Sequence, residues 1–209
     1  MRADAQRNAD KLRQAATELF RERGLDAPLK EIARRAGVSH GTLYNLFGTR
    51  EALINAVLPD LAVDRLEAVA TRALDCEDPW EGFVGYLEGL CELQAADPAI
   101  SDILSGRYPG VGPLMTACDR TFAVTQQIVE RARDAGALRP DFAPEDILFI
   151  LGTNAALARA AADTAPDAWR RFLAFMVDGL RAEAAHPLPG DPLTPAQFFE
   201  VLSNFPAKA

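Results

Sequence analysis

The chain has 209 residues, of which 49% are hydrophobic and 25% charged, and it carries 22 Lys and Arg against 30 Asp and Glu, a formal charge of −8. This composition excludes a disordered chain and is typical of a globular protein with its own hydrophobic core. No apolar run approaches the ~18 residues of a membrane span, and the N-terminus lacks the apolar core of a signal peptide. We therefore expect a cytoplasmic protein.

The net acidity hides an asymmetry along the chain. Residues 1–50 contain ten Lys and Arg against six Asp and Glu, a charge of +4, whereas residues 51–209 contain twelve against twenty-four, a charge of −12. Binding to phosphate depends on Lys and Arg, so a basic N-terminal segment on an acidic body indicates that this segment faces nucleic acid.

The N-terminal segment has the pattern of three helices. Residues 9–20 place apolar side chains three and four positions apart, which predicts a helix that ends at Gly24. A second, shorter helix is expected to begin near Pro28, and the turn Gly37-Val38-Ser39 then leads into a third helix over residues 40–47, with Ser39 as its N-cap. Two short helices joined by a tight Gly-containing turn match a helix-turn-helix, whose second helix enters the major groove of DNA.

The exposed face of the third helix carries hydrogen-bonding groups and no acids. Asn can form a bidentate pair with adenine, Thr can touch a base edge or a thymine methyl, and Tyr and His reach phosphate or base. Arg34 and Arg35 add flanking cations for phosphate contacts. The alternative is an ordinary three-helix unit with a solvated polar face. The candidate DNA-binding residues are Lys30, Ser39, His40, Gly41, Thr42, Tyr44, Asn45 and Arg50.

The rest of the chain has a helical period throughout, and we find no convincing strand. We expect an all-α protein with a helix-turn-helix DNA-binding domain over residues 1–48, a helical effector-binding and dimerisation domain over 49–185, and a Pro-rich tail over 186–209. The helices expected after residue 48 cover residues 49–69 with a bend at Pro59, then 79–95, 100–104, 114–135, 144–162, a helix from 166 onward, and a short helix at 195–203.

Residues 29–58 (LKEIARRAGVSHGTLYNLFGTREALINAVL) resemble the DNA-binding segment of the TetR (tetracycline repressor) family of bacterial transcription regulators. The most specific parts are Ala36-Gly37-Val38-Ser39, Gly41-Thr42-Leu43-Tyr44 and the opening Arg50-Glu51-Ala52-Leu53 of the fourth helix. A looser resemblance to one branch of the family covers residues 136–146 and the Pro-rich tail.

This resemblance implies an all-α homodimer whose short N-terminal domain binds DNA and whose larger C-terminal domain binds a small molecule and dimerises. It also implies that Thr42 and Tyr44 contact DNA and that Arg50 contacts phosphate, where the family usually has a lysine. His40 stands where Lys is common, and Leu46 where a second aromatic residue is common.

The middle helices could surround a mostly apolar effector cavity with a few polar groups. Arg107 and Tyr108, on the Gly/Pro-rich loop 105–113, could form its lid, although a solvated loop charge is the preferred interpretation of Arg107. For the other residues, plain core packing is an equally good interpretation, with Asn154 satisfied by a neighbouring helix. The candidate ligand-binding residues are Phe83, Tyr86, Leu87, Leu90, Arg107, Tyr108, Cys118, Phe122 and Asn154.

Small and bulky apolar residues combine in the last two long helices. This combination predicts a self-complementary four-helix contact between two copies of the chain, and the alternative is a core within one copy. The candidate interface residues are Ala156, Ala160, Trp169, Phe172, Leu173 and Met176.

Together these features predict a ligand-responsive homodimer that binds a palindromic operator and, by the family's usual mode, represses until a small molecule releases it. One rival is a redox sensor based on Cys91 or Cys118, and another is an architectural DNA-binding protein without an effector. We find no Gly-rich phosphate loop, nucleophile elbow or metal-spaced His/Cys/Asp cluster, so we expect no enzyme activity, no metal and no cofactor.

Overall fold

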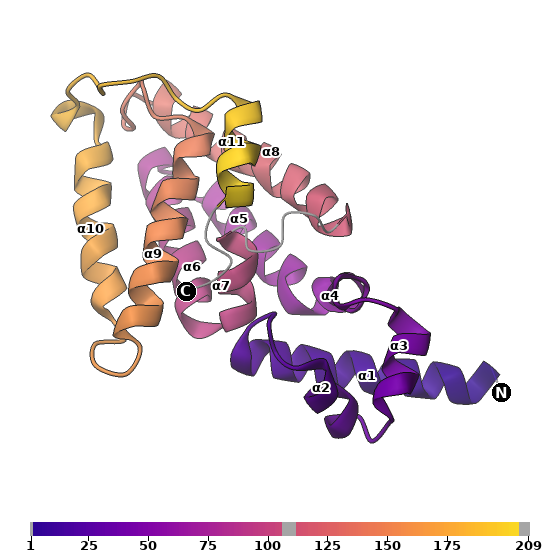
Figure 1. Cartoon of the computed structure of the whole chain (residues 1–209). Coiled ribbons are helices and arrows are strands. Elements are labelled where there is room, and N and C mark those ends of the chain that lie inside the picture. The colour runs from indigo at the N-terminus through magenta and orange to yellow at the C-terminus, as the bar shows by residue number, and fades with distance from the viewer. Residues whose placement is uncertain (1, 106–111, 205–209) are drawn as a thin grey trace.

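The computed structural model describes residues 2–105 and 112–204, and their side chains except at residues 2, 112–121, 184, 195, 199 and 202–204 (Figure 1). The prediction of an all-α fold is confirmed, and within these ranges the β-type pairing is limited to an isolated bridge between Leu138 and Arg181. The helices are α1 (Arg2–Arg23), α2 (Leu29–Arg35), α3 (His40–Phe47), α4 (Arg50–Leu58), α5 (Asp64–Asp75), α6 (Pro79–Ala96), α7 (Pro98–Leu104), α8 (Gly112–Asp134), α9 (Ile147–Ala161), α10 (Ala168–Leu180) and α11 (Pro195–Asn204).

Helix caps explain why several boundaries were predictable. The Ser39 hydroxyl accepts a hydrogen bond from the N–H of Thr42 at 3.0 Å, and the Thr49 hydroxyl accepts one from the N–H of Ala52 at 3.1 Å. These side chains start α3 at the cap expected from the sequence, and α4 at Thr49, the Thr residue with which the helix predicted over residues 49–69 begins. Gly136 has φ +68°, a left-handed conformation that ends α8.

Other boundaries differ from the predictions. Helix α1 begins at Arg2 rather than at residue 9. The sequence did not reveal its first turns because they are solvent-exposed and have no apolar periodicity. Pro28 is the N-cap of α2 and not its first helical residue. The bend at Pro59 takes the form of a π-helical turn, Pro59–Val63, between α4 and α5.

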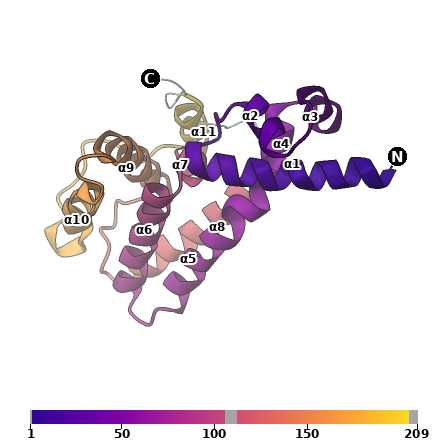
Figure 2. The ribbon, with the colours of Figure 1, turned by 90° about the horizontal axis from the view of Figure 1, so that it is seen from below.

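The helices enclose two hydrophobic cores. The first is formed by α1–α4 and α7, around Leu19, Phe20, Leu43 and Ile100, and the second by α5, α6 and α8–α10, around Phe83 and Tyr86. The head α1–α3 and the pair α9–α10 lie at opposite ends of the molecule, with α5, α6 and α8 between them (Figures 1 and 2). Helices α4 and α7 lie beyond residue 48 but contribute residues to the first core, together with the head. The first core therefore extends past the domain boundary expected at residue 48, and that boundary stays a prediction.

Arg139 anchors the start of the tail. Its buried guanidinium donates to the Asp141 carboxylate at 2.6 and 3.1 Å, to the carbonyl of Gly179 at 3.1 Å and to the carbonyl of His186 at 2.5 Å. Asp141 also accepts a hydrogen bond from the N–H of Leu188 at 3.3 Å. One arginine thus ties the α8–α9 connection to the end of α10 and to the tail.

We expect the contribution of Asp141 to stability to depend on pH. The Arg139 guanidinium holds the pKa of the Asp141 carboxyl below its ordinary value of 3.8. A lowered carboxyl pKa stabilises the fold above the ordinary value, and this stabilisation is lost as the pH falls through the lowered pKa. Thermal unfolding should therefore separate wild type from Asp141→Asn at pH 7, and the separation should shrink below about pH 4. A separation that stays constant down to pH 3 would contradict this.

None of the helices in the described ranges has the length and hydropathy of a membrane-spanning segment.

Candidate nucleic-acid interface and effector region

Helix α3, the recognition helix of the predicted helix-turn-helix, is positioned by a tight turn and one buried anchor. Gly37 has φ +69°, which lets the chain reverse between α2 and α3, and the N–H of Val38 then bonds to the carbonyl of Ala33 at 3.0 Å. Leu43 is fully buried in the first core. Because Leu43 faces inward, the opposite side of this two-turn helix is turned to solvent.

The solvent-facing side of α3 has an ordered arrangement of polar side chains. Tyr44 is 46% exposed, and its ring meets that of His40 edge to face at 4.8 Å between centroids. The hydroxyls of Ser39 and Thr42 share a hydrogen bond of 2.8 Å. Gly41 and Asn45 are exposed, and α3 contains no acidic residue. This face can offer hydrogen bonds to base edges without repelling phosphate.

The cations expected around α3 have differing environments. Lys30 is exposed. Arg35 forms two hydrogen bonds with Glu22, at 2.6 and 2.9 Å, and Arg34 lies 3.5 Å from Glu31. Arg50 donates from its guanidinium to the carbonyls of two residues of the α1–α2 turn. The sequence revealed the basic charge of the head but not these internal partners.

The four ligand-binding candidates of α6 lie together in the second core: Phe83, Tyr86, Leu87 and Leu90 are all buried there. The Tyr86 hydroxyl shares a hydrogen bond of 2.7 Å with Thr125 of α8. Phe122 is half-buried, and its ring lies 5.9 Å from that of Phe198 in α11. The structure thus brings Tyr86 of α6 against α8, whereas the ring contact of Phe122 is with α11.

The remaining candidates for the effector region are less clearly placed. Asn154 of α9 is fully buried and donates to Gln94 of α6 at 2.9 Å, while its side-chain oxygen has no partner among the described residues. Arg107 and Tyr108 lie outside the described residues, as does the side chain of Cys118. Ligand binding by this region stays a prediction.

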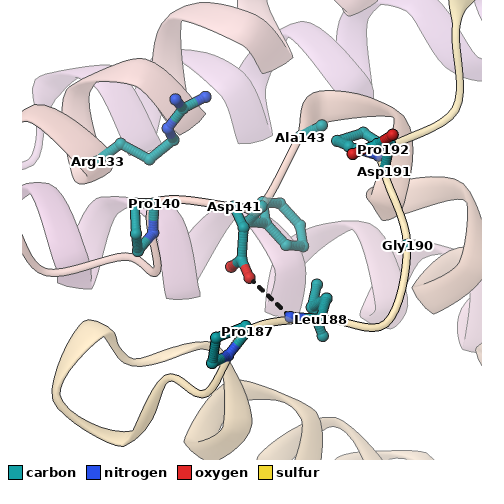
Figure 3. Close-up of a pocket in the computed structure, with 10 residues that line it drawn as sticks. Arg133, Pro140, Asp141, Ala143, Pro187, Leu188, Gly190, Asp191 and Pro192 are labelled. Atoms are coloured by element: carbon teal, nitrogen blue, oxygen red, sulfur yellow. Dashed lines mark hydrogen bonds between the residues drawn. The ribbon is translucent and has the colours of Figure 1, made fainter.

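A pocket of about 330 Å³ lies at a different place, between the α8–α9 connection and the tail (Figure 3). Asp141 points across it toward the N–H of Leu188, which is the hydrogen bond drawn in the figure. None of the predicted ligand-binding residues lines it. Its lining consists of Arg133, Pro140, Asp141, Phe142, Ala143, Pro187, Leu188, Gly190, Asp191 and Pro192.

The residues proposed for a dimer contact differ in how deeply a single copy of the chain buries them. Trp169 and Leu173 are buried within the chain's own second core, whereas Ala156 and Ala160 are exposed, and Phe172 and Met176 are half-buried. Two large residues on the same helices are exposed but were not among the predicted interface residues: Phe149 on α9 at 44% and Phe175 on α10 at 62%. For Phe149 the sequence did contain an indication: α9 is apolar nearly all round, and such a helix is expected to pack against other helices on most of its sides.

Cys91 is buried in the second core, and burial raises the pKa of its thiol to about 12. At pH 8 only about one part in 10⁴ of such a thiol is ionised, and the thiolate is the reactive form. We expect a Cys76→Ser/Cys118→Ser variant to react with a disulfide reagent only when denaturant is added. Rapid labelling of the native variant would restore Cys91 as a redox-sensor candidate.

Comparison with known families gives two matches along the chain. The family described as bacterial regulatory proteins, tetR family, matches residues 12–57, and the family described as transcriptional regulator SbtR-like, C-terminal domain, matches residues 78–182. The first match contains the helix-turn-helix, and the second runs from the cap of α6 to just past the end of α10.

Several characterised and uncharacterised regulators are similar in sequence. UidR of Escherichia coli K12 is 30% identical over 154 residues, which cover 68% of this chain and 74% of that protein. The regulator YvdT of Bacillus subtilis is 38% identical over 72 residues, and the repressor Rv3405c of Mycobacterium tuberculosis is 45% identical over 67 residues. These last two alignments span about a third of each relative, 37% and 33%.

Solved structures share the fold. The TetR regulator SCO0520 of Streptomyces coelicolor is 32% identical, with a TM-score of 0.51 over 83% of this chain and 98% of that one. RolR in complex with resorcinol, at 24% identity, has a TM-score of 0.59 over 91% of this chain and 99% of its own. Regulators of the tetR family, such as UidR, are not enzymes. A family match over half of the chain, together with the alignment to UidR, shows that this protein belongs to the TetR family of DNA-binding transcriptional regulators.

Proposed function

We propose that the protein is a homodimeric repressor, which binds a palindromic operator through α3 and releases it when a small molecule binds among α6, α8 and α9. The observation that carries this proposal is the acid-free face of α3, with Tyr44 exposed and held against His40. Thr42, Asn45 and Gly41 complete the surface that would lie against base edges, and Lys30 and Ser39 would contact phosphates.

Arg50 has a different role in this proposal from the one expected from the sequence. Its hydrogen bonds to backbone carbonyls hold one side of the guanidinium within the head. The positive charge of Arg50 remains and contributes to the attraction of phosphate. Because its guanidinium is hydrogen-bonded to backbone carbonyls of the same chain, its main role in this proposal is to hold the α1–α2 turn in place.

The proposed dimer contact is the exposed apolar side of α9 and α10, at the end of the molecule opposite the head (Figure 1). Phe149 and Phe175 are large apolar side chains left in solvent by a single copy of the chain. Small residues beside them, Ala156 and Ala160, would let the helices of two copies approach closely. Pairing through this side would form a four-helix contact and set the distance between the two recognition helices.

The proposed effector site uses the mostly apolar surroundings of Phe83 and Tyr86, with Asn154 as an orienting polar group. RolR, which shares the fold, is described in complex with the small molecule resorcinol, in keeping with a small-molecule site in this fold. A ligand that binds better when the recognition helices do not match successive major grooves, about 34 Å apart, shifts the population away from the DNA-bound form. Ligand and operator then weaken each other's binding by the same factor.

A thermal-shift screen followed by DNA titration tests this mechanism. A compound at about 100 times its Kd is expected to stabilise the protein by about 2.7 kcal/mol. The same compound should weaken binding to an operator duplex in a gel-shift titration at fixed salt. Compounds that stabilise the protein while leaving the DNA affinity unchanged, or raising it, would exclude ligand-induced release.

A further inference from the structure

The turn between α1 and α2, residues 24–27, is held by a buried carboxylate from a distant part of the chain. The Asp102 side chain of α7 accepts a hydrogen bond from the N–H of Leu25 at 2.8 Å. Asp102 is 4% exposed and Leu25 is fully buried. A buried carboxylate is stabilised only when hydrogen bonds compensate its lost hydration, and its charge strengthens the bond that it accepts.

Gly24 allows this close approach. Its φ is +80°, and a Cβ atom at this position would lie 2.5 Å from the Asp102 carboxylate oxygen. Both the backbone conformation and the space beside it therefore require glycine. The sequence indicated Gly24 only as a helix stop, whereas the structure gives it a second role as the contact point of α7.

The same turn is bound by Arg50, the first residue of α4, which lies shortly after the recognition helix. Arg50 donates to the carbonyl of Leu25 at 2.7 Å and to the carbonyl of Ala27 at 2.8 Å. Gly48 and Thr49, the C-cap of α3 and the N-cap of α4, are the residues between Arg50 and α3. The N–H side of Leu25 is thus held by α7, and its carbonyl side by the α3–α4 corner.

Helix α7 has a second buried acid that faces the head. Asp97 caps the N-terminus of α7, pairs with Arg65 of α5 at 2.6 Å and lies 3.8 Å from Arg21 of α1. Helix α7 also packs against α6 and α9. It therefore contacts the head on one side and the helices of the proposed effector site on the other.

We propose that Asp102 is a positioning residue for DNA binding: its carboxylate and the Arg50 guanidinium together clamp residues 24–27 and thereby fix the recognition helix relative to α7. This inference rests on the proposed homodimeric, operator-binding function. Without the clamp each head can still bind DNA, but the two α3 helices of a dimer lose their fixed separation. The clamp therefore acts on the simultaneous binding of two half-sites and not on the surface that reads one half-site.

The test compares two duplexes: an operator selected from random-sequence DNA by the intact wild-type protein, and a duplex that contains one half of it. Asp102→Ala should bind the full operator at least tenfold more weakly than wild type, with less than a threefold change on the half-site duplex at low salt. Asp102→Asn, whose amide oxygen can still accept the Leu25 hydrogen bond, should restore most of the affinity. Gly24→Ala, which forces the turn away from Asp102, should behave like Asp102→Ala.

The matched control is Asp141→Asn. It also changes a carboxylate that accepts a backbone hydrogen bond, but this carboxylate lies in the α8–α9 connection and its partner, Leu188, lies in the tail. It should leave both affinities unchanged. Equal losses on the full and half-site duplexes would show general damage to the head and overturn the inference, as would full affinity in Asp102→Ala and Gly24→Ala.

Hydrogen exchange without DNA separates this inference from the proposed function and remains informative if Asp102→Ala does not fold. In Gly24→Ala, amides of residues 24–27 and of α3 should exchange faster than in wild type, while those of α9 and α10 should not change; in Asp102→Asn, which keeps the Leu25 hydrogen bond, the turn should exchange close to the wild-type rate. Unchanged exchange in the turn and in α3 of Gly24→Ala would overturn the clamp even if operator binding is established. Failure of the wild type to select any two-part operator would overturn the proposed function, and the exchange result would still decide the clamp.

Discussion

Replacing Tyr44 by alanine is expected to weaken operator binding by on the order of 100-fold, because a contact to a base is worth about 1–3 kcal/mol and a dimer loses two of them. Tyr44 is exposed on the acid-free face of α3 and packs against His40, so its removal takes away both a contact and the partner that orders the imidazole. A gel-shift titration at fixed salt measures the loss, since affinities at different salt concentrations are not comparable.

Tyr44→Phe is the matched control for this prediction. It keeps the ring that packs on His40 and removes only the hydroxyl. An intermediate affinity would assign part of the effect to a hydrogen bond of the hydroxyl with DNA. Wild-type affinity in Tyr44→Ala would show that α3 does not bind DNA through this face.

Replacing Phe175 by glutamate is expected to convert the dimer into a monomer and to abolish tight operator binding. Phe175 is 62% exposed in a single copy of the chain, and burial of such a side chain against a partner contributes roughly 1.5–3 kcal/mol in each of two symmetric positions. A glutamate there would bring a charge into the apolar contact and strip it of its hydration, although Arg171 lies one turn away on the same helix. Sedimentation or light scattering over a concentration series gives the oligomeric state directly.

The control for the dimer prediction is Leu188→Glu. Leu188 is an exposed apolar residue, at 45%, but it lies on the tail and not on α9 or α10. It should remain a dimer with unchanged operator affinity. A Phe175→Glu variant that stays dimeric would place the contact between copies on another surface.

Much of the head was predictable from the sequence because its signals are local. Ser39, Thr49 and Gly37 each act within a few residues, through caps or a positive φ, and these positions located α3 and the start of α4. The acid-free face of α3 follows from helical period and composition alone. The start of α1 was missed because its first turns have no buried face.

Contacts between distant segments could not be predicted in this way. Asp102 and Leu25 are 77 residues apart, and nothing in the sequence around either indicates their hydrogen bond. The resemblance implies that Arg50 contacts phosphate, which stays a prediction; its hydrogen bonds to two carbonyls could not be predicted because they depend on where the α1–α2 turn folds. The exposure of Phe149 and Phe175 likewise depends on which sides of α9 and α10 the chain's own core covers.

The most direct test of the whole account is a footprint of the intact protein on the duplex that it selects from random-sequence DNA. The account predicts two protected half-sites related by a dyad, with centres about 34 Å or a multiple of it apart, bound by two copies of the chain. The Tyr44→Ala variant should leave both half-sites unprotected at the same concentration. Selection of no sequence at all, or protection of a single asymmetric site by one copy, would contradict it.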